Sequence, residues 1–395
     1  MSVYDFTTAP RRDMDEALKW KIMKEKKPGV REGIVPFSIA DMEFANPPEI
    51  REGLSEYIQT AVLGYQTAGP AFYEAVGSWT KRRYGRAIRP EWLITTPGVV
   101  NALFHAAAAF AEEGEGVIIM PPVYPLFYKA VEKTGRRLVR CPLLEEDGRY
   151  VIDYEKMEEL AAREENKVLL FCSPHNPTGR VWSREELERL GEICLRHGVF
   201  IISDEIHCDL IMPGHAFTSF AAISGELERN TMTCISPSKT FNLAGLETSI
   251  VIVPDPERMR ALKRRMACAG QEGRVNALGY KACEIAYTRC DEWLSQALEV
   301  IYENHLALKA FLGERCPQIR VFPLEGTYLQ WMDLHALGWT KEEQERRMVE
   351  ADLFLDEGYI FGPEGEGFER LNLACPKQIL MEALERLAGA VGRGG

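Results

Sequence analysis

Three polar side chains stand where strands of this chain are predicted to end: Asn176, Asp204 and Lys239. Each follows a short apolar run of the kind that forms a buried strand. The three are separated by 28 and then 35 residues, which matches one strand–helix unit for each gap. Because ligands of open α/β sheets bind at the carboxyl ends of parallel strands, we expect all three side chains to reach one crevice.

Each residue type offers a specific piece of chemistry. A buried carboxylate such as Asp204 is costly unless a cation or hydrogen-bond donors meet it, and a protonated pyridine nitrogen is such a cation. Ser236 and Ser238 precede Lys239, and two hydroxyls beside a lysine suit a phosphate held close to an amine. A desolvated lysine with a lowered pKa can form a Schiff base. Asn176 lies between two prolines that fix a rigid loop and direct its amide.

Each of these residues also has an ordinary structural explanation when taken alone. Asn176 would lie in a strand-to-helix loop, Asp204 would cap the next helix, and Lys239 would be an exposed loop lysine. His207, close behind Asp204, is better explained as a packing residue than as a catalyst. The common signatures GxxxxGK, HExxH and GxSxG are absent from the sequence, as is a full GxGxxG. The shared position at strand ends is therefore what favours a site.

The elements that must position these residues alternate along the middle of the chain. The predicted strands are Val117–Met120, Lys167–Cys172, Val199–Ser203, Thr231–Ile235 and Ser249–Val253. Between the second and third, Ser183 can cap a helix, Glu186 can complete a capping box, and Gly198 can end the helix. Near-continuous apolar strands separated by helices predict an α/β fold with a parallel sheet that is covered on both faces.

From about residue 290 the pattern changes to long helices around short strands. The predicted elements there are helices at Asp291–Leu312 and Lys341–Ala351 and strands at Tyr328–Met332 and Arg370–Leu373. This predicts a second, smaller α+β domain. We expect three parts in all: an N-terminal segment, 1–45, that joins the small domain; a large domain, 46–290; and the small C-terminal domain, 291–395.

Composition excludes several classes of protein. The 395 residues carry 47 basic and 59 acidic side chains, a net charge of −12, which argues against nucleic-acid binding. An apolar fraction of 46% and a charged fraction of 27% indicate a globular chain. The first residues lack an apolar core, and the longest apolar stretches are far shorter than the ~20 residues of a membrane span, so we expect neither signal peptide nor membrane. Ten scattered cysteines without zinc or redox spacing predict no metal site and a reducing, cytoplasmic location.

The sequence resembles the fold-type I pyridoxal-phosphate enzymes of the class I/II aminotransferase superfamily. Within it, the chain is most similar to the PatB/MalY group of carbon–sulfur β-lyases, also called cystathionine β-lyases. The motifs that carry the resemblance are Ile39–Phe44, Gly64-Tyr65, Pro122–Tyr124, Ser173–Gly179, Ser203–His207, Ser236–Asn242 and Gly367–Asn372. The resemblance covers essentially the whole chain. The motifs Ile39–Phe44 and Ser236–Asn242 separate this group from ordinary aminotransferases. The resemblance implies a large domain with a mostly parallel sheet plus a smaller α+β domain.

The resemblance also implies roles around the cofactor ring. Lys239 would hold pyridoxal 5′-phosphate as a Schiff base and, once displaced by substrate, would remove and return the Cα proton. Asp204 would pair with the pyridinium nitrogen and keep the ring an electron sink. Asn176 would bond the 3′ oxygen of the ring, and Tyr124 would stack on its face. Tyr124 or Lys239 would protonate the departing thiolate.

For the phosphate, the implied donors are the backbone N–H groups of Val99 and Val100, which lead into a helix predicted at 101–111. Ser236 and Ser238 would add hydroxyls, and Tyr65 would reach the phosphate from a partner subunit. A homodimer with shared active sites would follow.

Arg370 would clamp the substrate α-carboxylate, helped by Asn176 and the backbone near Ala40. Without the resemblance, Tyr65 and Tyr124 could be core aromatics, and Arg370 could form a surface ion pair with Glu369.

One departure from the superfamily pattern is informative. Many aminotransferases place an arginine for the phosphate shortly after the lysine, whereas this chain reads Leu243–Glu247 there. The missing arginine favours the lyase group, and we expect the Glu247 side chain to turn away from the phosphate.

The activity implied is α,β-elimination from L-cystathionine or a related L-cysteine S-conjugate, giving a thiol (homocysteine), pyruvate and ammonia. An aminotransferase is the alternative, because it would share all of these residues. A pyridoxal-phosphate-dependent DNA-binding regulator is disfavoured, because residues 1–36 are too few for a winged helix ahead of Phe37 and the net charge is acidic.

Overall fold

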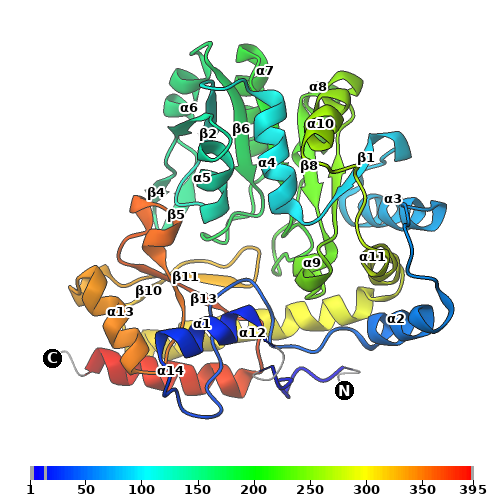
Figure 1. Cartoon of the computed structure of the whole chain (residues 1–395). Helices are drawn as coiled ribbons and strands as arrows, with labels where there is room; N and C mark the ends of the chain where they lie inside the picture. Colours follow the sequence, from blue (N-terminus) through cyan, green and yellow to red (C-terminus); the bar gives the residue numbers. More distant parts are fainter. Residues whose placement is uncertain (1–3, 13–15, 393–395) are drawn as a thin grey trace.

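A seven-stranded sheet forms the centre of the computed structural model, which describes residues 4–12 and 16–392 (Figure 1). Its strand order is β1-β9-β8-β7-β6-β2-β3. The strands are β1 (Leu93–Thr96), β2 (Gly116–Ile119), β3 (Arg137–Arg140), β6 (Asn166–Cys172), β7 (Phe200–Asp204), β8 (Thr231–Ile235) and β9 (Ser249–Ile252). All five predicted strands are present within one residue of their predicted bounds. The two edge strands, β1 and β3, were not predicted.

Strand β9 departs from the parallel arrangement that the apolar runs predict. It pairs antiparallel with both of its neighbours, β1 and β8, whereas β2, β3, β6, β7 and β8 run parallel. The connection from β8 to β9, residues 236–248, holds only the four-residue helix α9 (Pro237–Thr240) and a short 3₁₀ turn. Such a connection does not carry the chain back along the sheet, so the next strand returns in the opposite direction.

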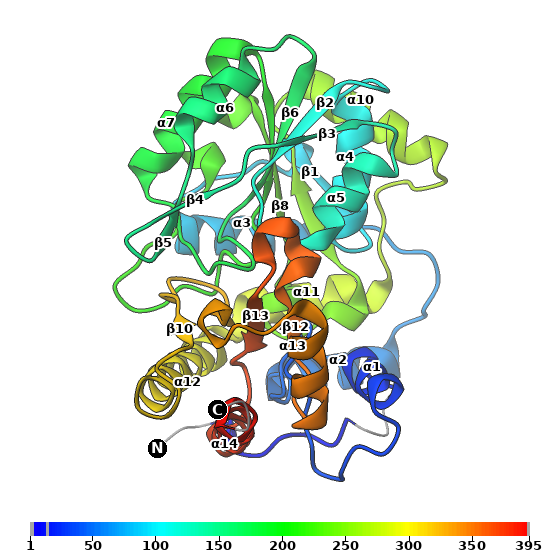
Figure 2. The ribbon, with the colours of Figure 1, turned by 90° about the vertical axis from the view of Figure 1, so that its left-hand side faces the viewer.

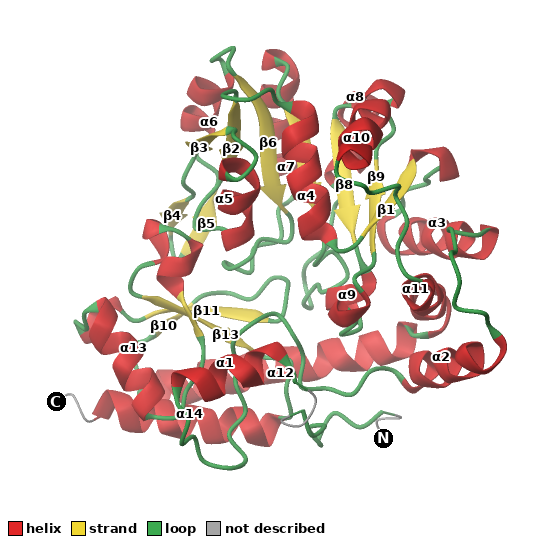
Figure 3. Ribbon diagram, in the orientation of Figure 1, coloured by secondary structure: helices red, strands yellow, loops and turns green. Residues whose placement is uncertain are grey.

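Helices cover both faces of this sheet (Figure 3). Along β6, Val168 and Leu170 pack among residues of one helix layer, and Leu169 and Phe171 pack among residues of the other, because successive side chains of a strand point to opposite faces. The first layer is α4 (Val99–Phe110), α5 (Pro125–Glu132) and α10 (Pro256–Cys268), and the second is α6 (Tyr154–Ala161), α7 (Arg184–His197) and α8 (Gly225–Arg229). The sheet is therefore buried on both sides.

The predicted capping of α7 is confirmed. The Glu186 N–H donates to Ser183 Oγ at 3.2 Å, and Glu186 Oε2 accepts from the Ser183 N–H at 2.7 Å. Gly198 follows the helix in the left-handed conformation, with φ 67°. Helix α4, by contrast, begins at Val99 rather than at the predicted Asn101, which places Val99 and Val100 in its first turn.

A second sheet of four antiparallel strands lies below the first (Figures 1 and 2). Its order is β10 (Arg320–Val321), β11 (Leu329–Asp333), β13 (Phe368–Asn372) and β12 (Asp356–Glu357). The helices on this side are α12 (Asp291–Arg315), α13 (Lys341–Glu350) and α14 (Lys377–Gly392). This confirms the predicted helices and strands of the C-terminal part, although β11 and β13 are each shifted by one or two residues.

The N-terminal segment is attached to the second sheet through backbone hydrogen bonds. The Phe37 N–H donates to the Phe354 carbonyl at 2.8 Å, and the Asn372 N–H donates to the Phe37 carbonyl at 3.0 Å.

The remaining elements are α1 (Leu18–Lys26), α2 (Pro48–Thr60), α3 (Pro70–Tyr84), α11 (Ala277–Arg289) and the hairpin β4 (Leu144–Glu146) and β5 (Arg149–Val151). Cys290 separates α11 from α12, and the division into 1–45, 46–290 and 291–395 stays a prediction. Across residues 4–12 and 16–392, none of the helices has both the length and the apolar character needed to cross a bilayer.

A buried ion pair ties the loop that carries Asn176 to the segment ahead of β11. Arg180 Nη1 pairs with Glu325, and the same carboxylate accepts from the Val181 N–H at 2.9 Å. The Glu325 N–H in turn donates to the Gly179 carbonyl at 3.0 Å. Both charged side chains are almost fully buried, and each has one further partner, Glu186 for Arg180 and Arg149 for Glu325.

We expect Glu325→Gln to lower the free energy of unfolding by about 3 kcal/mol, because it removes the buried carboxylate shared by Arg180 and Arg149 and leaves the buried Arg180 cation with Glu186 alone. The shift of the urea unfolding midpoint measures this. Glu159→Gln removes an exposed carboxylate that pairs with Lys156 and Arg163, and it should leave the midpoint unchanged. Equal midpoints for the two variants would contradict this account of the pair.

Candidate active site

A cavity of about 440 Å³ lies at the carboxyl ends of the central strands. The predicted site residues that line it are Ala40, Val99, Val100, Tyr124, Asn176, Asp204, Ser238, Lys239 and Arg370. The convergence follows from the sheet, because β6, β7 and β8 are parallel neighbours. Asn176 follows β6, Asp204 ends β7, and Lys239 lies in α9 directly after β8. Two predicted residues, Ser236 and Tyr65, do not line the cavity.

The Lys239 amine is held at the floor of the cavity by backbone. Its Nζ donates a hydrogen bond to the Ala40 carbonyl at 2.8 Å. Burial lowers the pKa of Lys239 to about 8, and Arg370 acts in the same direction, while Asp41 and Asp204 oppose it. At neutral pH a larger fraction of this amine is therefore uncharged than for an ordinary lysine, and the uncharged form is the one that acts as a base or a nucleophile.

The Asp204 carboxylate lacks a cation of its own. It is buried, and its Oδ1 accepts one hydrogen bond, from the Ile206 N–H at 3.1 Å. Burial raises the pKa of Asp204 to about 7; Glu205 raises it further, and the Ile206 N–H and Lys239 lower it. A cationic ring nitrogen would supply the missing partner, so Asp204 fits the pyridine ring of pyridoxal phosphate.

The phosphate end of the cofactor also fits the residues present. Gly98 adopts φ 85°, and a Cβ there would meet no atom within 4 Å, so the chain turns into α4 beside open space. Within residues 4–12 and 16–392, no side chain caps α4, which leaves the N–H groups of its first turn, at Val99 and Val100, available to an anion. The Ser238 side chain lines the same cavity.

Ser236 instead organises α9. Its Oγ donates to the Thr248 carbonyl at 2.7 Å and accepts from the Ser238 N–H at 3.1 Å. The residue is buried, so the structure gives its hydroxyl a capping role rather than a place in the cavity. It acts on the site by positioning Ser238 and Lys239.

Tyr124 stands at the N-terminus of α5 and faces the cavity. Burial raises the pKa of its hydroxyl to about 12; Arg370 lowers it, and Asp204 and Asp356 raise it. The phenol is therefore protonated at neutral pH and is able to donate its proton.

Arg370 is buried in β13 and is not a surface residue. Its Nη1 donates to Asn176 Oδ1 at 2.7 Å, and its Nη2 pairs with the Asp356 carboxylate. The alternative pairing with Glu369 is wrong, because the Glu369 carboxylate accepts from Gln344 Nε2 at 2.9 Å. Arg370 thus presents a compensated guanidinium to the cavity.

The sequence did not single out two residues of this cavity, Asp356 and Phe361, and it gave His207 only a packing role. Asp356 and Phe361 lie in short elements without a periodic pattern, and both contact the Arg370 guanidinium. His207 lines the cavity, its ring is buried, and its Nδ1 has no hydrogen-bond partner among the described residues. Burial lowers the pKa of His207, with Lys239 and Arg370 acting in the same direction. Glu247 is exposed and lines the cavity, and the expectation that it turns away from a phosphate stays a prediction.

Comparisons with known proteins agree with this geometry. The sequence model of the aminotransferase class I and II family matches residues 32–387. The chain is 40% identical over 381 residues to cystathionine beta-lyase PatB of Bacillus subtilis, covering 95% of this chain and 98% of PatB.

Two solved structures share the fold over nearly their whole length. Cystalysin from Treponema denticola, which contains a pyridoxal 5′-phosphate cofactor, superposes with a TM-score of 0.97 at 44% identity and covers 99% of both chains. The PLP-bound C-S lyase from Staphylococcus hominis superposes with a TM-score of 0.90 at 29% identity and covers 98% of both chains. The chain therefore belongs to the class I and II aminotransferase family and, within it, to the cystathionine β-lyase group that includes PatB.

Proposed function

We propose that the protein is a pyridoxal-phosphate-dependent carbon–sulfur β-lyase. It cleaves L-cystathionine or a related L-cysteine S-conjugate to a thiol, pyruvate and ammonia. The observation that carries the proposal is a lysine of lowered pKa, Lys239, in one cavity with an uncompensated carboxylate, Asp204, and a guanidinium, Arg370. The similarity to PatB, cystalysin and the C-S lyase supports the choice of reaction.

When bound, pyridoxal phosphate supplies an electron sink that stabilises negative charge at the substrate Cα. Asp204 would hold its ring nitrogen, and the N–H groups of Val99 and Val100 with the Ser238 hydroxyl would hold its phosphate. Asn176 and Tyr124 would contact the ring. The missing arginine after Lys239 leaves these neutral donors to bind the phosphate.

Arg370 binds the α-carboxylate of the substrate and fixes its orientation. Among the described residues that line the cavity, Lys239 and Arg370 are the cations, whereas Asp204, Glu247 and Asp356 are acidic. One chain therefore offers no second cation for a side-chain carboxylate. This favours a substrate whose far end is uncharged or zwitterionic over the dicarboxylates of an aminotransferase.

Lys239 and Tyr124 move the protons of the reaction. Neutral Lys239 removes the Cα proton, and the Cβ–S bond then breaks with its electron pair going to sulfur. The sulfur takes a proton from Tyr124 or from protonated Lys239 and leaves as the thiol. Water completes the conversion of the three-carbon remainder to pyruvate and ammonia.

The proposal includes a two-fold symmetric dimer with shared sites. Tyr65 is fully exposed in the single chain, and the apolar residues Ile58, Val62 and Leu63 next to it are exposed as well. A patch of this kind marks an interaction surface.

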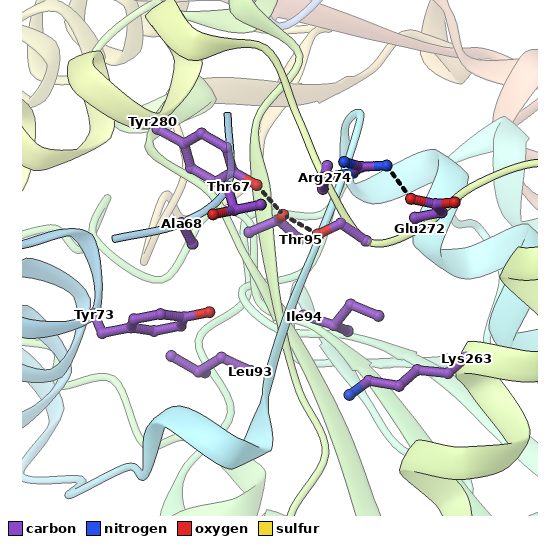
Figure 4. Close-up of a pocket in the computed structure, with 11 residues that line it drawn as sticks. Thr67, Ala68, Tyr73, Leu93, Ile94, Thr95, Lys263, Glu272, Arg274 and Tyr280 are labelled. Carbon is purple, nitrogen blue, oxygen red and sulfur yellow. Dashed lines mark hydrogen bonds and ion pairs between the residues drawn. The ribbon is translucent and has the colours of Figure 1, made fainter. Parts of the chain in front are cut away.

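A second cavity, of about 390 Å³, is lined by residues that include Thr67, Tyr73, Thr95, Arg274 and Tyr280 (Figure 4). Thr67 follows Tyr65 of this patch by two residues in the sequence. The Thr95 and Tyr280 hydroxyls lie 3.0 Å apart on the wall of the cavity. A hollow beside a protruding apolar segment suits a self-complementary contact, which would bring Tyr65 to the partner's phosphate site.

We expect Lys239→Ala to lose lyase turnover by at least about a thousandfold, because it removes both the amine that holds the cofactor and the base that takes the Cα proton. The variant should also stop the exchange of the substrate Cα hydrogen in D2O, which NMR follows directly. The control is Lys377→Ala, which replaces an exposed lysine at the start of α14 and should keep both the lyase turnover and the Cα hydrogen exchange. Exchange that persists in Lys239→Ala would rule out this residue as the base.

Asp204→Asn should stabilise the apoprotein while weakening cofactor binding. The folded-state pKa of Asp204, about 7, lies above the ordinary value of 3.8, so the folded protein carries a penalty that grows from pH 4 to pH 7 and persists above it. The penalty is at most about 4 kcal/mol. We expect the apoprotein Tm of the variant to exceed that of the wild type by a few °C at pH 8, with no difference near pH 4.

The dissociation constant for pyridoxal phosphate should meanwhile rise at least about tenfold, because the ring nitrogen loses its anionic partner. Asp147→Asn, in the exposed turn between β4 and β5, is the control for both measurements. Unchanged cofactor affinity in Asp204→Asn would contradict the assignment.

Mixed dimers test the shared sites. Tyr65→Ala and Lys239→Ala homodimers should each lose most activity, since one lacks the phosphate contact and the other the base. A mixed dimer contains one site with both wild-type residues, so random mixing should restore about a quarter of wild-type turnover per chain. Mixtures that stay as inactive as the two parents would show that Tyr65 does not serve the partner's site.

A further inference from the structure

One carboxylate joins the guanidinium of Arg370 to the backbone of the N-terminal segment. Asp356 lies in β12 directly opposite Arg370 in β13. Its Oδ2 accepts from Arg370 Nη2 and, at 2.8 Å, from the Ile39 N–H. All three residues line the active-site cavity. Asp356 thus connects two walls of that cavity that are far apart in the sequence.

The hydrogen bonds of Arg370 leave a matched pair of donors. Each terminal nitrogen of a guanidinium carries two N–H groups. Nη1 donates one N–H to Asn176, and Nη2 donates one N–H to Asp356. Each terminal nitrogen therefore keeps one N–H group with which to bind a substrate carboxylate in a bidentate manner. Nε is buried and has no hydrogen-bond partner among the residues that the structure describes. Asn176 and Asp356 therefore set the rotation of the group and decide which N–H groups face the substrate.

The Ile39 N–H, which also donates to Asp356, belongs to strained backbone. Ile39 adopts φ 59°, a conformation that a β-branched residue rarely takes. It is held there by Asp356 at its N–H and by Asn372 Nδ2, which donates to its carbonyl at 2.9 Å. The next residue, Ala40, presents the carbonyl that accepts from Lys239. The strain at Ile39 is thus placed between the substrate-binding arginine and the base.

We propose that Asp356 is a positioning residue for the reaction. It fixes the Arg370 guanidinium for the substrate carboxylate, and it holds the strained turn at Ile39 so that the Ala40 carbonyl meets Lys239. The inference rests on the proposed function, because that function makes Arg370 the carboxylate-binding residue. The negative charge of Asp356 repels an incoming carboxylate, but a buried guanidinium without its partner loses the orientation on which bidentate binding depends.

The test uses the holoenzyme and 3-(methylthio)propionate, a thioether carboxylate without an amine. This probe can occupy the carboxylate site but has no nitrogen with which to displace Lys239. Asp356→Asn should weaken its binding, measured by calorimetry, about tenfold. The KM for L-cystathionine should rise by a similar factor, with kcat changing less than about threefold. Glu357→Gln removes the neighbouring charge on the same strand, which pairs with Lys26, and should change neither value.

A second variant separates the two parts of the proposal. Ile39→Gly relieves the strain, because glycine adopts a positive φ readily. In that background Asp356→Asn should still weaken the probe about tenfold, because Arg370 loses its carboxylate partner in either case. The pH dependence of Cα hydrogen exchange, which reports Lys239, should shift in Asp356→Asn alone and not in the Ile39→Gly background, so the two substitutions are non-additive for this readout. The same shift in both backgrounds would overturn the role at Ile39. Unchanged probe affinity in Asp356→Asn would overturn the whole proposal.

Further variants keep the result decisive. Asp356→Glu retains the charge but displaces it, so it should also weaken the probe; wild-type affinity there would show that only charge matters and would overturn the positioning role. If Arg370→Gln binds the probe as well as the wild type, the assignment of Arg370 and the proposed function fail, independently of Asp356. A folded, probe-binding wild type that does not cleave cystathionine would likewise count against the function and leave the probe result for Asp356 standing.

Discussion

The burial of charge at the carboxyl ends of β6, β7 and β8 is the constraint on which the rest of the site depends. Of the charged groups that line this cavity, Arg370, Lys239 and Asp204 each need a partner there. Arg370 has Asp356 and Asn176, and Lys239 has the Ala40 carbonyl. Asp204 has a single backbone N–H. The unmet requirement of Asp204, together with the uncapped start of α4, makes this cavity complementary to a ligand with a cation at one end and an anion at the other.

The N-terminal segment closes the arrangement, because Ile39 and Ala40, at the start of its Ile-Ala-Asp-Met-Glu-Phe run, line the cavity. Asp41 is held by Arg12, with Nη2 2.8 Å from Oδ2, and its carbonyl accepts from Lys19 Nζ at 2.6 Å. Lys19 also pairs with Glu43 at 2.7 Å, and both side chains are almost completely buried. The two charged residues of this motif, Asp41 and Glu43, are thus held by ion pairs with Arg12 and Lys19, which lie earlier in the N-terminal segment.

Much of the fold was predictable because local rules and the global arrangement agree. Apolar runs placed the five predicted strands, and Ser183, Glu186 and Gly198 marked the ends of α7. The hairpin of β4 and β5 turns at Asp147-Gly148, both with positive φ, and that dipeptide is a hairpin signal that sequence reasoning overlooked.

Other features depend on tertiary contacts that no local pattern encodes. The direction of β9 follows from the short connection before it, and the partner of Arg370 lies in a two-residue strand without periodicity. The Ser236 hydroxyl does not line the cavity because it donates to the carbonyl of Thr248, a residue twelve positions further along the chain that no local motif identifies. The strand-end positions of Asn176, Asp204 and Lys239 were sufficient to find the site, whereas Asp356, and the place of His207 in the cavity, required the structure.

A product analysis of the purified holoenzyme with L-cystathionine alone distinguishes a lyase from an aminotransferase. We expect pyruvate and free thiol to rise together in equal amounts, without any added keto acid, because the Cβ–S bond breaks in the cavity. Conversion that requires 2-oxoglutarate and releases neither pyruvate nor thiol would contradict it and would identify the protein as an aminotransferase.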